Sequence, residues 1–193
     1  MADKVETIKG KDRVTFLRPY KERATMPARL VPYQTSLTFD PSVDTDSTAT
    51  KDGNVNSIGA VETDWEFEAI NSTSEILDKT LAALFAKEKM EIWLVNRARK
   101  NADGKYEAWY GQGIVSEDSS DNDADDNSTR DITMTIDGTP KHGWVELSDV
   151  QQEEIDYVFY GLGAVTDADK TGAGTAFDES KDAGVNVADA PKA

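Results

Sequence analysis

Acidic side chains are the residues of this chain whose spacing could carry out chemistry. In the stretch VETDWEFEAI (61–70), every second residue is acidic: Glu62, Asp64, Glu66 and Glu68. Two carboxyl groups can hydrolyse a glycosidic bond, but only when they occupy different environments within a cleft. A regular row on one strand face gives its members similar environments. We therefore expect no catalytic residues in this row, and we expect that the protein is not an enzyme.

A second acidic cluster, in the stretch DNDADDN, resembles the start of a calcium-binding loop. Asp121, Asp123 and Asp125 have the spacing of the first three ligand positions. The pattern then fails, because the sixth position is Asp126 instead of glycine and the twelfth is Ile132 instead of glutamate. We favour a hydrated acidic loop, and adventitious calcium binding is the alternative. The sequence thus predicts no metal site and no cofactor.

The composition argues against several classes of protein. Lys and Arg total 21 against 37 Asp and Glu, giving a formal net charge of −16. Nucleic-acid binders need positive charge to displace counterions from phosphates, and anionic membranes repel such an acidic surface. The chain has no cysteine and one histidine, His142, which excludes disulfides and zinc clusters of Cys or His. We expect His142, in the turn-like TPKHGW, to be a surface residue and not a general base.

The elements that must position the acidic row are strands. If residues 61–70 form a strand, the row lies on one face, and Trp65 and Phe67 lie on the other as core anchors. Carboxylates at alternate positions are roughly 6.5–7 Å apart and repel by about 0.6 kcal/mol in water, so the row must be hydrated. Two interpretations remain open: an ordinary solvated face, or a surface kept negative against a polyanion. A strand within 28–39 is the expected neighbour, and its polar face carries Gln34, Ser36 and Thr38.

The remaining pattern predicts a mainly β protein with one helix. The helix is expected over residues 72–88, with a capping box at Ser72 and Glu75 and with Leu81 and Phe85 on its core-facing stripe. Further strands are expected at 12–20, 90–99, 105–115, 130–138 and 141–147, a short helix at 148–154, and polar loops at 40–56 and 116–129. This pattern indicates an antiparallel β-sandwich or partly closed barrel with a flanking helix. We expect one domain over 1–161 and a low-complexity extension over 162–193.

The order of these stretches resembles that of the major tail proteins, or tail-tube proteins, of long-tailed non-contractile phages of Gram-positive hosts, particularly lactic acid bacteria. The resemblance starts at TIKGKDRVTFLRP (7–19) and LVPYQTSLTFD (30–40). It continues through the acidic row, the helix and the hairpin MEIWLVNRARKNADGKYEAWYGQGIV (90–115). It covers about residues 7–161 and has no short specific signature.

The resemblance implies a structural role. In this family six copies form a ring, rings stack into a tube, and one sheet of each copy lines the lumen that conducts genomic DNA. By order, the strand of the acidic row is a lumen strand. The long loop at 40–56, with Asp44, Asp46, Lys51 and Asp52, reaches the adjacent ring. The implied partners are further copies of the chain, a tape-measure protein inside the tube, and tail-terminator and distal tail proteins at its ends. DNA would pass through without being bound.

Two other classes fit the acidity and the strands. One is a monomeric β-sandwich for adhesion or carbohydrate binding, and the other is a phage head–tail joining ring protein. Formation of long tubes distinguishes the tail-tube interpretation from both.

Overall fold

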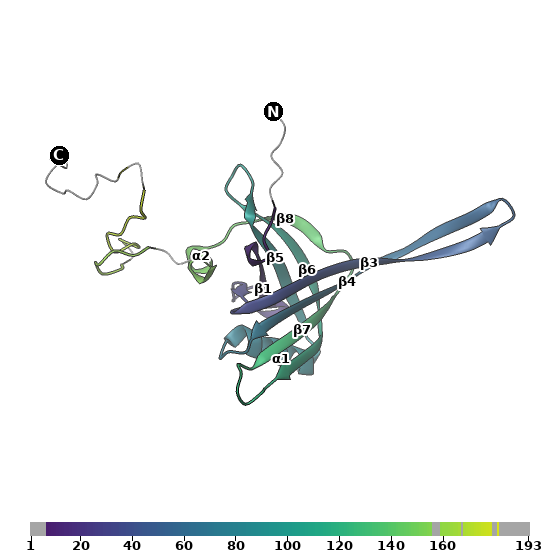
Figure 1. Ribbon diagram of the computed structural model, residues 1–193, viewed down its shortest axis with the longest axis horizontal. Coiled ribbons are helices and arrows are strands. Elements are labelled where there is room, and N and C mark those ends of the chain that lie inside the picture. Colours follow the sequence, from purple (N-terminus) through teal and green to yellow (C-terminus); the bar gives the residue numbers. More distant parts are fainter. Residues whose placement is uncertain (1–6, 156–158, 167, 179–180, 182–193) are drawn as a thin grey trace. The chain divides into compact units, whose positions relative to one another are not determined.

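A computed structural model describes residues 7–155, 159–166, 168–178 and 181 (Figure 1). The chain divides into two compact units, Met1–Gln151 and Gln152–Ala193. Much of the expected extension, including residues 182–193, lies outside the described residues. The boundary that we expect at 161/162 stays a prediction.

One antiparallel sheet makes up most of the first unit. The strands are β1 (Arg13–Pro19), β2 (Arg29–Leu30), β3 (Gln34–Thr50), β4 (Gly53–Ile70), β5 (Lys89–Lys100), β6 (Tyr106–Asp121), β7 (Thr129–Ile136) and β8 (Lys141–Val145). Their order in the sheet is β2-β1-β5-β6-β7-β4-β3, and β8 pairs with β6. Short 3-10 turns at Gly10–Asp12 and Tyr20–Glu22 flank β1. The expected mainly β, antiparallel class with a flanking helix is confirmed.

The sheet curls around a core without closing by backbone pairing. Strands β3 and β1 approach each other where the curled sheet would close, and we call this gap the seam. The side chain of Gln34 in β3 bridges it: Gln34 Oε1 accepts from the Thr15 amide of β1 at 3.0 Å, and Gln34 Nε2 donates to Thr15 Oγ1 at 3.2 Å. Trp65 and Phe67 of β4, 0 % and 2 % exposed, lie in the core with Ile92 of β5. Burying each large apolar side chain contributes about 1.5–3 kcal/mol, so residues of several strands hold the curl together.

Helix α1 (Glu75–Ala86) packs on the curled sheet and is shorter than expected. The sequence prediction of a capping box at Ser72 is wrong. Ser74 is the N-cap and its side chain makes no cap hydrogen bond, whereas the Ser72 hydroxyl is buried without a partner among the described residues. Lys87 is the C-cap of the helix and has a left-handed φ of 55°. A short helix, α2 (Asp149–Ile155), follows β8 as expected.

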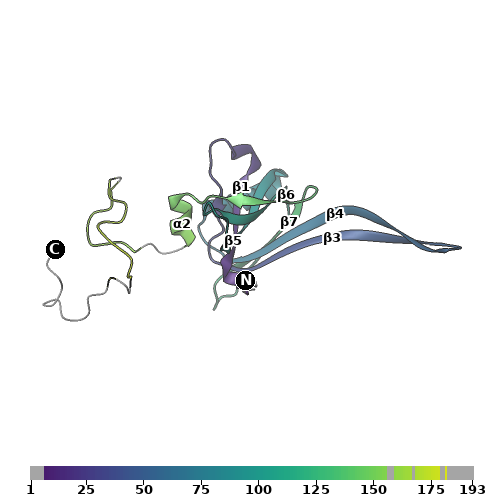
Figure 2. The same cartoon turned by 90° about the horizontal axis from the view of Figure 1, so that it is seen from above.

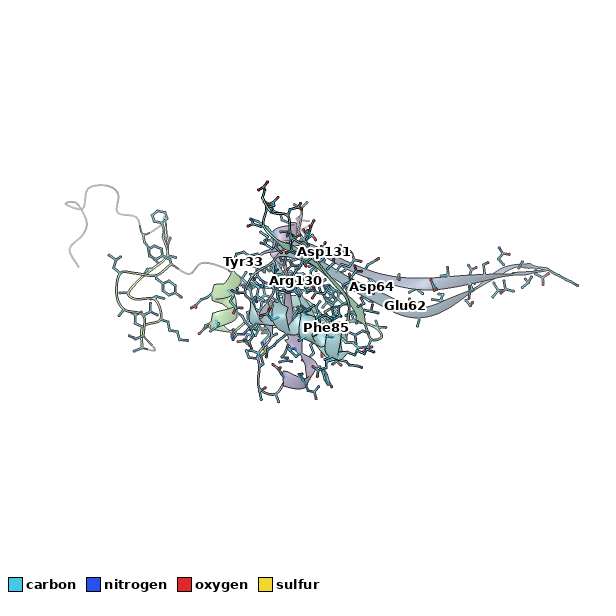
Figure 3. The ribbon with its side chains drawn as sticks, turned by 90° about the horizontal axis from the view of Figure 1, so that it is seen from below. Tyr33, Glu62, Asp64, Phe85, Arg130 and Asp131 are labelled. Atoms are coloured by element: carbon cyan, nitrogen blue, oxygen red, sulfur yellow. The ribbon has the colours of Figure 1, made fainter. Side chains whose placement is uncertain are left out.

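The assignment of Leu81 and Phe85 as core anchors is wrong for the single subunit. Leu81 is 37 % exposed and Phe85 is 76 % exposed. The buried positions of α1 include Ile76, Leu77, Thr80 and Ala83. Because each residue turns the helix by about 100°, Phe85 points about 140° away from Thr80 and faces outward (Figure 3). Neither helix among the described residues has the length and apolar content needed to cross a membrane.

The two expected polar loops are largely strand. Residues 40–56 belong to a long hairpin in which β3 and β4 pair from Thr50–Gly53 back to the sheet, leaving only Lys51 and Asp52 as the turn. This hairpin projects from the body in both views (Figures 1 and 2). Likewise, β6 continues to Asp121 along β7, so the acidic loop shortens to 122–128. We expected loops because both segments are rich in turn-forming residue types. Backbone pairing with the neighbouring strand outweighs the weak local preference of these residues for turns.

The second unit contains a small hydrogen-bonded turn, which the composition did not predict. The amides of Gly161 and Gly163 donate to the carbonyl oxygens of Thr171 and Gly172, at 2.8 and 3.0 Å. Hydrogen bonds from the backbone amides of Thr171 and Ala173 lower the pKa of Asp169. The described residues in 161–166 and 168–174 thus form local hydrogen bonds at the start of the expected low-complexity extension.

Candidate functional site

The acidic row alternates with core residues along β4. Glu62, Asp64 and Glu66 are exposed and Glu68 is half-buried, whereas Trp65 between them is fully buried. The Phe39 ring of β3 lies 4.8 Å from the Trp65 ring, and the two residues are paired in the ladder. A slip by one residue would exchange the two faces, so burial of the aromatic residues fixes the direction of the carboxylates.

Neighbouring strands enlarge the row into a charged face. Asp40 of β3 lies directly opposite Asp64, and Asp131 of β7 lies directly opposite Glu68. Thr133 of β7 lies opposite both Glu117 of β6 and Glu66 of β4. Directly opposite residues point to the same side of a sheet, so Glu117 lies on the same side as the row. We call this surface the acidic face; it comprises Asp40, Glu62, Asp64, Glu66, Glu68, Glu117 and Asp131. Sequence reasoning missed three members, because only the register of the sheet brings them beside the row.

No positive charge from these strands compensates the acidic face. Strands β3, β4, β6 and β7 contain a single basic residue, Arg130. Its side chain is turned inward and 6 % exposed, and it pairs with the Asp118 carboxylate and donates to the Leu77 carbonyl of α1 at 3.2 Å (Figure 3). Like charges directly opposite each other destabilise a sheet, so the acidic face requires water and counterions.

One neutral group supports the row. The Thr135 hydroxyl of β7 donates to Asp64 Oδ1 at 2.9 Å. Ser36 and Thr38, which we expected beside the row, are exposed and lie opposite Glu68 and Glu66. The sheet therefore presents hydroxyls and carboxylates together on this side, a combination that binds water.

Gln34 does not lie on the acidic face, and its assignment there is wrong. Tyr33 interrupts the expected strand with a φ of 52°, and the register shifts between Gln34 and Ser36. The shift turns the Gln34 side chain to Thr15 at the seam. A strict alternation counted along the sequence fails at such a bulge.

The projecting part of the hairpin, residues 41–60, is called the arm below. Its charged residues Asp44, Asp46, Lys51 and Asp52 are all exposed. Three apolar side chains of the arm are exposed as well: Val43, Val55 and Ile58, at 39 %, 61 % and 76 %. The sequence interpretation did not single out these three residues.

A cluster around Glu107 fixes β8 on β6. His142 Nε2 lies 2.8 Å from Glu107 Oε1, and the imidazole stacks on Trp109 with ring centroids 4.5 Å apart. Burial raises the pKa of Glu107, but hydrogen bonds from Asn96 and His142 and the charge of Arg99 outweigh it, so that the pKa is lowered. His142 lies in a strand and is half-exposed; the turn that we expected ends before it. Its contacts are those of a residue that holds two strands together.

The other acidic cluster lies at the end of β6. Asp121, Asp123 and Asp126 line a hollow of about 230 Å³. Within the described part of the chain, no three acidic or histidine side chains converge to form a group that could hold a metal ion.

Comparison with known proteins gives a consistent result. A family model described as phage tail tube protein matches residues 7–142. The SPP1 tail tube, determined by solid-state NMR and cryo-EM, has a TM-score of 0.61 and 16% identity, covering 85% of this chain and 97% of that chain. No curated protein matches the sequence.

Two structures of gene transfer agents have the same fold. The tail of an empty particle, determined with helical refinement and C6 symmetry, has a TM-score of 0.57 and 10% identity. The match covers 71% of this chain and 99% of that chain. The native virion gives a TM-score of 0.56 and 8% identity with the same coverage.

Proposed function

This chain belongs to the phage tail tube protein family, and we propose that it forms hexameric rings that stack into a tail tube. In this proposal the acidic face lines the lumen, and genomic DNA passes through during ejection. The protein is a structural component of the virion tail and is assembled in the host cytoplasm. The tail is of the long, non-contractile type found on phages of Gram-positive hosts.

The observation that carries the proposal is the acidic face itself. Duplex DNA has one negative charge per roughly 1.7 Å of its axis and binds surfaces whose Lys and Arg displace its counterions. A lumen lined by Glu62, Asp64, Glu66 and Glu68 offers no such contact. Repulsion keeps the duplex away from the wall, so the DNA slides without binding. An ordinary solvated face needs no such uniform charge, since mixed charges across strands would be more stable.

Ring formation is supported by the edges of the sheet. Strand β3 is the last strand in the sheet order, and β2 at the other edge has two residues. An exposed edge pairs readily with another chain, and closing the sheet across subunits removes it. Six copies per ring agree with the C6 symmetry of the gene transfer agent tail.

The remaining partners follow from the architecture of a tube. A tape-measure protein would occupy the lumen before DNA does, and terminator and distal tail proteins would close the ends. The arm, with Asp44, Asp46, Lys51 and Asp52, would reach the adjacent ring.

Electron microscopy of the purified protein at high concentration tests assembly. Long tubes with a regular repeat are expected. Single rings would favour a head–tail joining protein, and persistent monomers would favour an adhesion or carbohydrate-binding module. Either outcome would contradict the proposal.

Charge reversal tests the role of the acidic face. The variant Glu62→Lys/Glu66→Lys should still form tubes, because both side chains are exposed. Its tubes should retain duplex DNA and support ejection poorly, as should a variant with Lys at all four positions of the row. The matched control Asp123→Lys/Asp125→Lys changes the charge equally in the exposed loop after β6. Normal DNA ejection by the first variant would contradict the electrostatic proposal.

A further inference from the structure

The arm is a surface that lacks a partner among the described residues of its own subunit. It is a two-stranded ribbon, and its side chains from Ser42 to Ala60 are exposed. Strand β4 pairs with β7 only from Asp64 onward, so the ribbon has no third strand among the described residues. A two-stranded ribbon is marginally stable in water at best. The arm therefore needs cover from outside the subunit.

One face of the arm combines apolar and acidic groups. The register pairs Thr48 with Val55 and Asp46 with Ser57, so Val55 and Asp46 share a face. Residues 41–60 contain three acidic residues and one basic residue, a net charge of −2. A complementary surface must therefore be apolar at its base and basic at its rim.

The mouth of the curled sheet is such a surface. A cavity of about 510 Å³ opens at the seam between β1 and β3, and we call it the mouth cavity. Its lining includes the apolar side chains of Leu37, Phe39 and Leu94 and the basic residues Lys11 and Arg13. Residues 9–13 contain three basic residues and one acidic residue, a net charge of +2 in a chain whose total is −16. Within the described part of the chain, neither Lys11 nor Arg13 has an ion-pair partner.

We propose that the mouth cavity of one copy receives the arm of a second copy. Val55 enters above the apolar lining, and Asp46 meets Lys11 and Arg13. By strand rise, the arm extends roughly 30 Å from its root. It points away from the body of its own subunit, which carries that subunit's mouth cavity (Figures 1 and 2). An arm therefore cannot fill the cavity of its own subunit, and the occupant is a second copy. Arm and mouth are different surfaces, so the contact is head-to-tail and propagates as a stack. The inference rests on the proposed tube and identifies which surface of the neighbouring ring the arm contacts.

Disulfide trapping tests the contact directly, because the chain has no cysteine of its own. Thr35→Cys places a thiol at the mouth cavity, and Thr48→Cys places one on the Asp46 face of the arm. Tubes grown from a mixture of the two variants should give cross-linked dimers under mild oxidation. Each variant alone, and a mixture of Thr48→Cys with Ala82→Cys on the exposed side of α1, should give none. Absence of dimers in the first mixture would overturn the proposal.

A charge swap tests the chemistry of the contact. Lys11→Glu and Asp46→Lys should each raise the protein concentration needed for tube growth by about tenfold or more, which corresponds to loss of one good polar contact. The two changes together should restore growth to within about twofold of the wild type. Lys87→Glu, an equal charge change at the end of α1, should leave growth unchanged. Failure of the pair to restore growth would overturn the inference.

These outcomes separate the two proposals. If the wild-type protein forms no tubes, the proposed function fails before the contact is tested. If it forms tubes but the arm and mouth neither cross-link nor rescue each other, the tube stands and the arm–mouth contact is wrong. Circular dichroism of each unassembled variant shows whether it is folded.

Discussion

The acidic face should cost the isolated subunit stability, and Asp40→Asn measures that cost. Asp40 lies directly opposite Asp64, a pairing that places the two Cβ atoms about 5 Å apart, and we take this spacing for the charges. In water this pair repels by about 0.8 kcal/mol, reduced to about 0.5 kcal/mol by 0.1 M salt. The diagonal neighbours Glu62 and Glu66, about 7–8 Å away, add about 0.3 kcal/mol each. Asp40→Asn should therefore stabilise the subunit by about 1 kcal/mol.

Urea unfolding of the unassembled protein measures this gain, since urea does not change the ionic strength. The difference between Asp40→Asn and wild type should fall to a few tenths of a kcal/mol in 1 M salt, where the Debye length is about 3 Å. Asp123→Asn removes the same charge from an exposed loop and should change stability by less than about 0.5 kcal/mol. A gain that is absent, independent of salt or equal in the control would refute the reasoning.

Three further predictions concern the body of the subunit. Asp118→Asn should lower the free energy of unfolding in urea by about 3–5 kcal/mol, because it leaves Arg130 buried and charged without its partner. Asp118→Leu/Arg130→Met should recover most of that stability, and no recovery would contradict this account. The folded-state pKa of Glu107 lies below its ordinary value of 4.5, so its contribution to stability is present above that value and lost as the pH falls. Glu107→Gln should therefore flatten the fall of the melting temperature between about pH 5 and 3, and an unchanged slope would count against the cluster. Phe85→Ala should change the subunit's stability by less than about 0.5 kcal/mol, and a loss near 3 kcal/mol would show that Phe85 is buried after all.

The sequence predicted those features that follow from local periodicity. Alternation along 61–70 placed the acidic row outward and Trp65 and Phe67 inward, as the structure has them. Residues 92–95 form an unbroken apolar run, a pattern typical of a strand covered on both faces, and in β5 these residues are buried or half-buried on both faces. The prediction failed for α1, where the apolar stripe of the helix is wider than the face that is buried on the sheet. Leu81 and Phe85 fit helical spacing but lie outside that buried face.

The sequence by itself determined that one strand face carries four carboxylates and must be hydrated, because side chains alternate and like charges cannot be buried together. Only the tertiary structure decided that Asp40, Glu117 and Asp131 join them, that Gln34 leaves them, and that Arg130 is turned inward to Asp118. The same holds for the arm and the mouth cavity. All of these features depend on the register of the sheet and on pairing between segments that are distant in sequence. Local spacing does not fix the register, and a one-residue shift would change the neighbours of every residue in the strand.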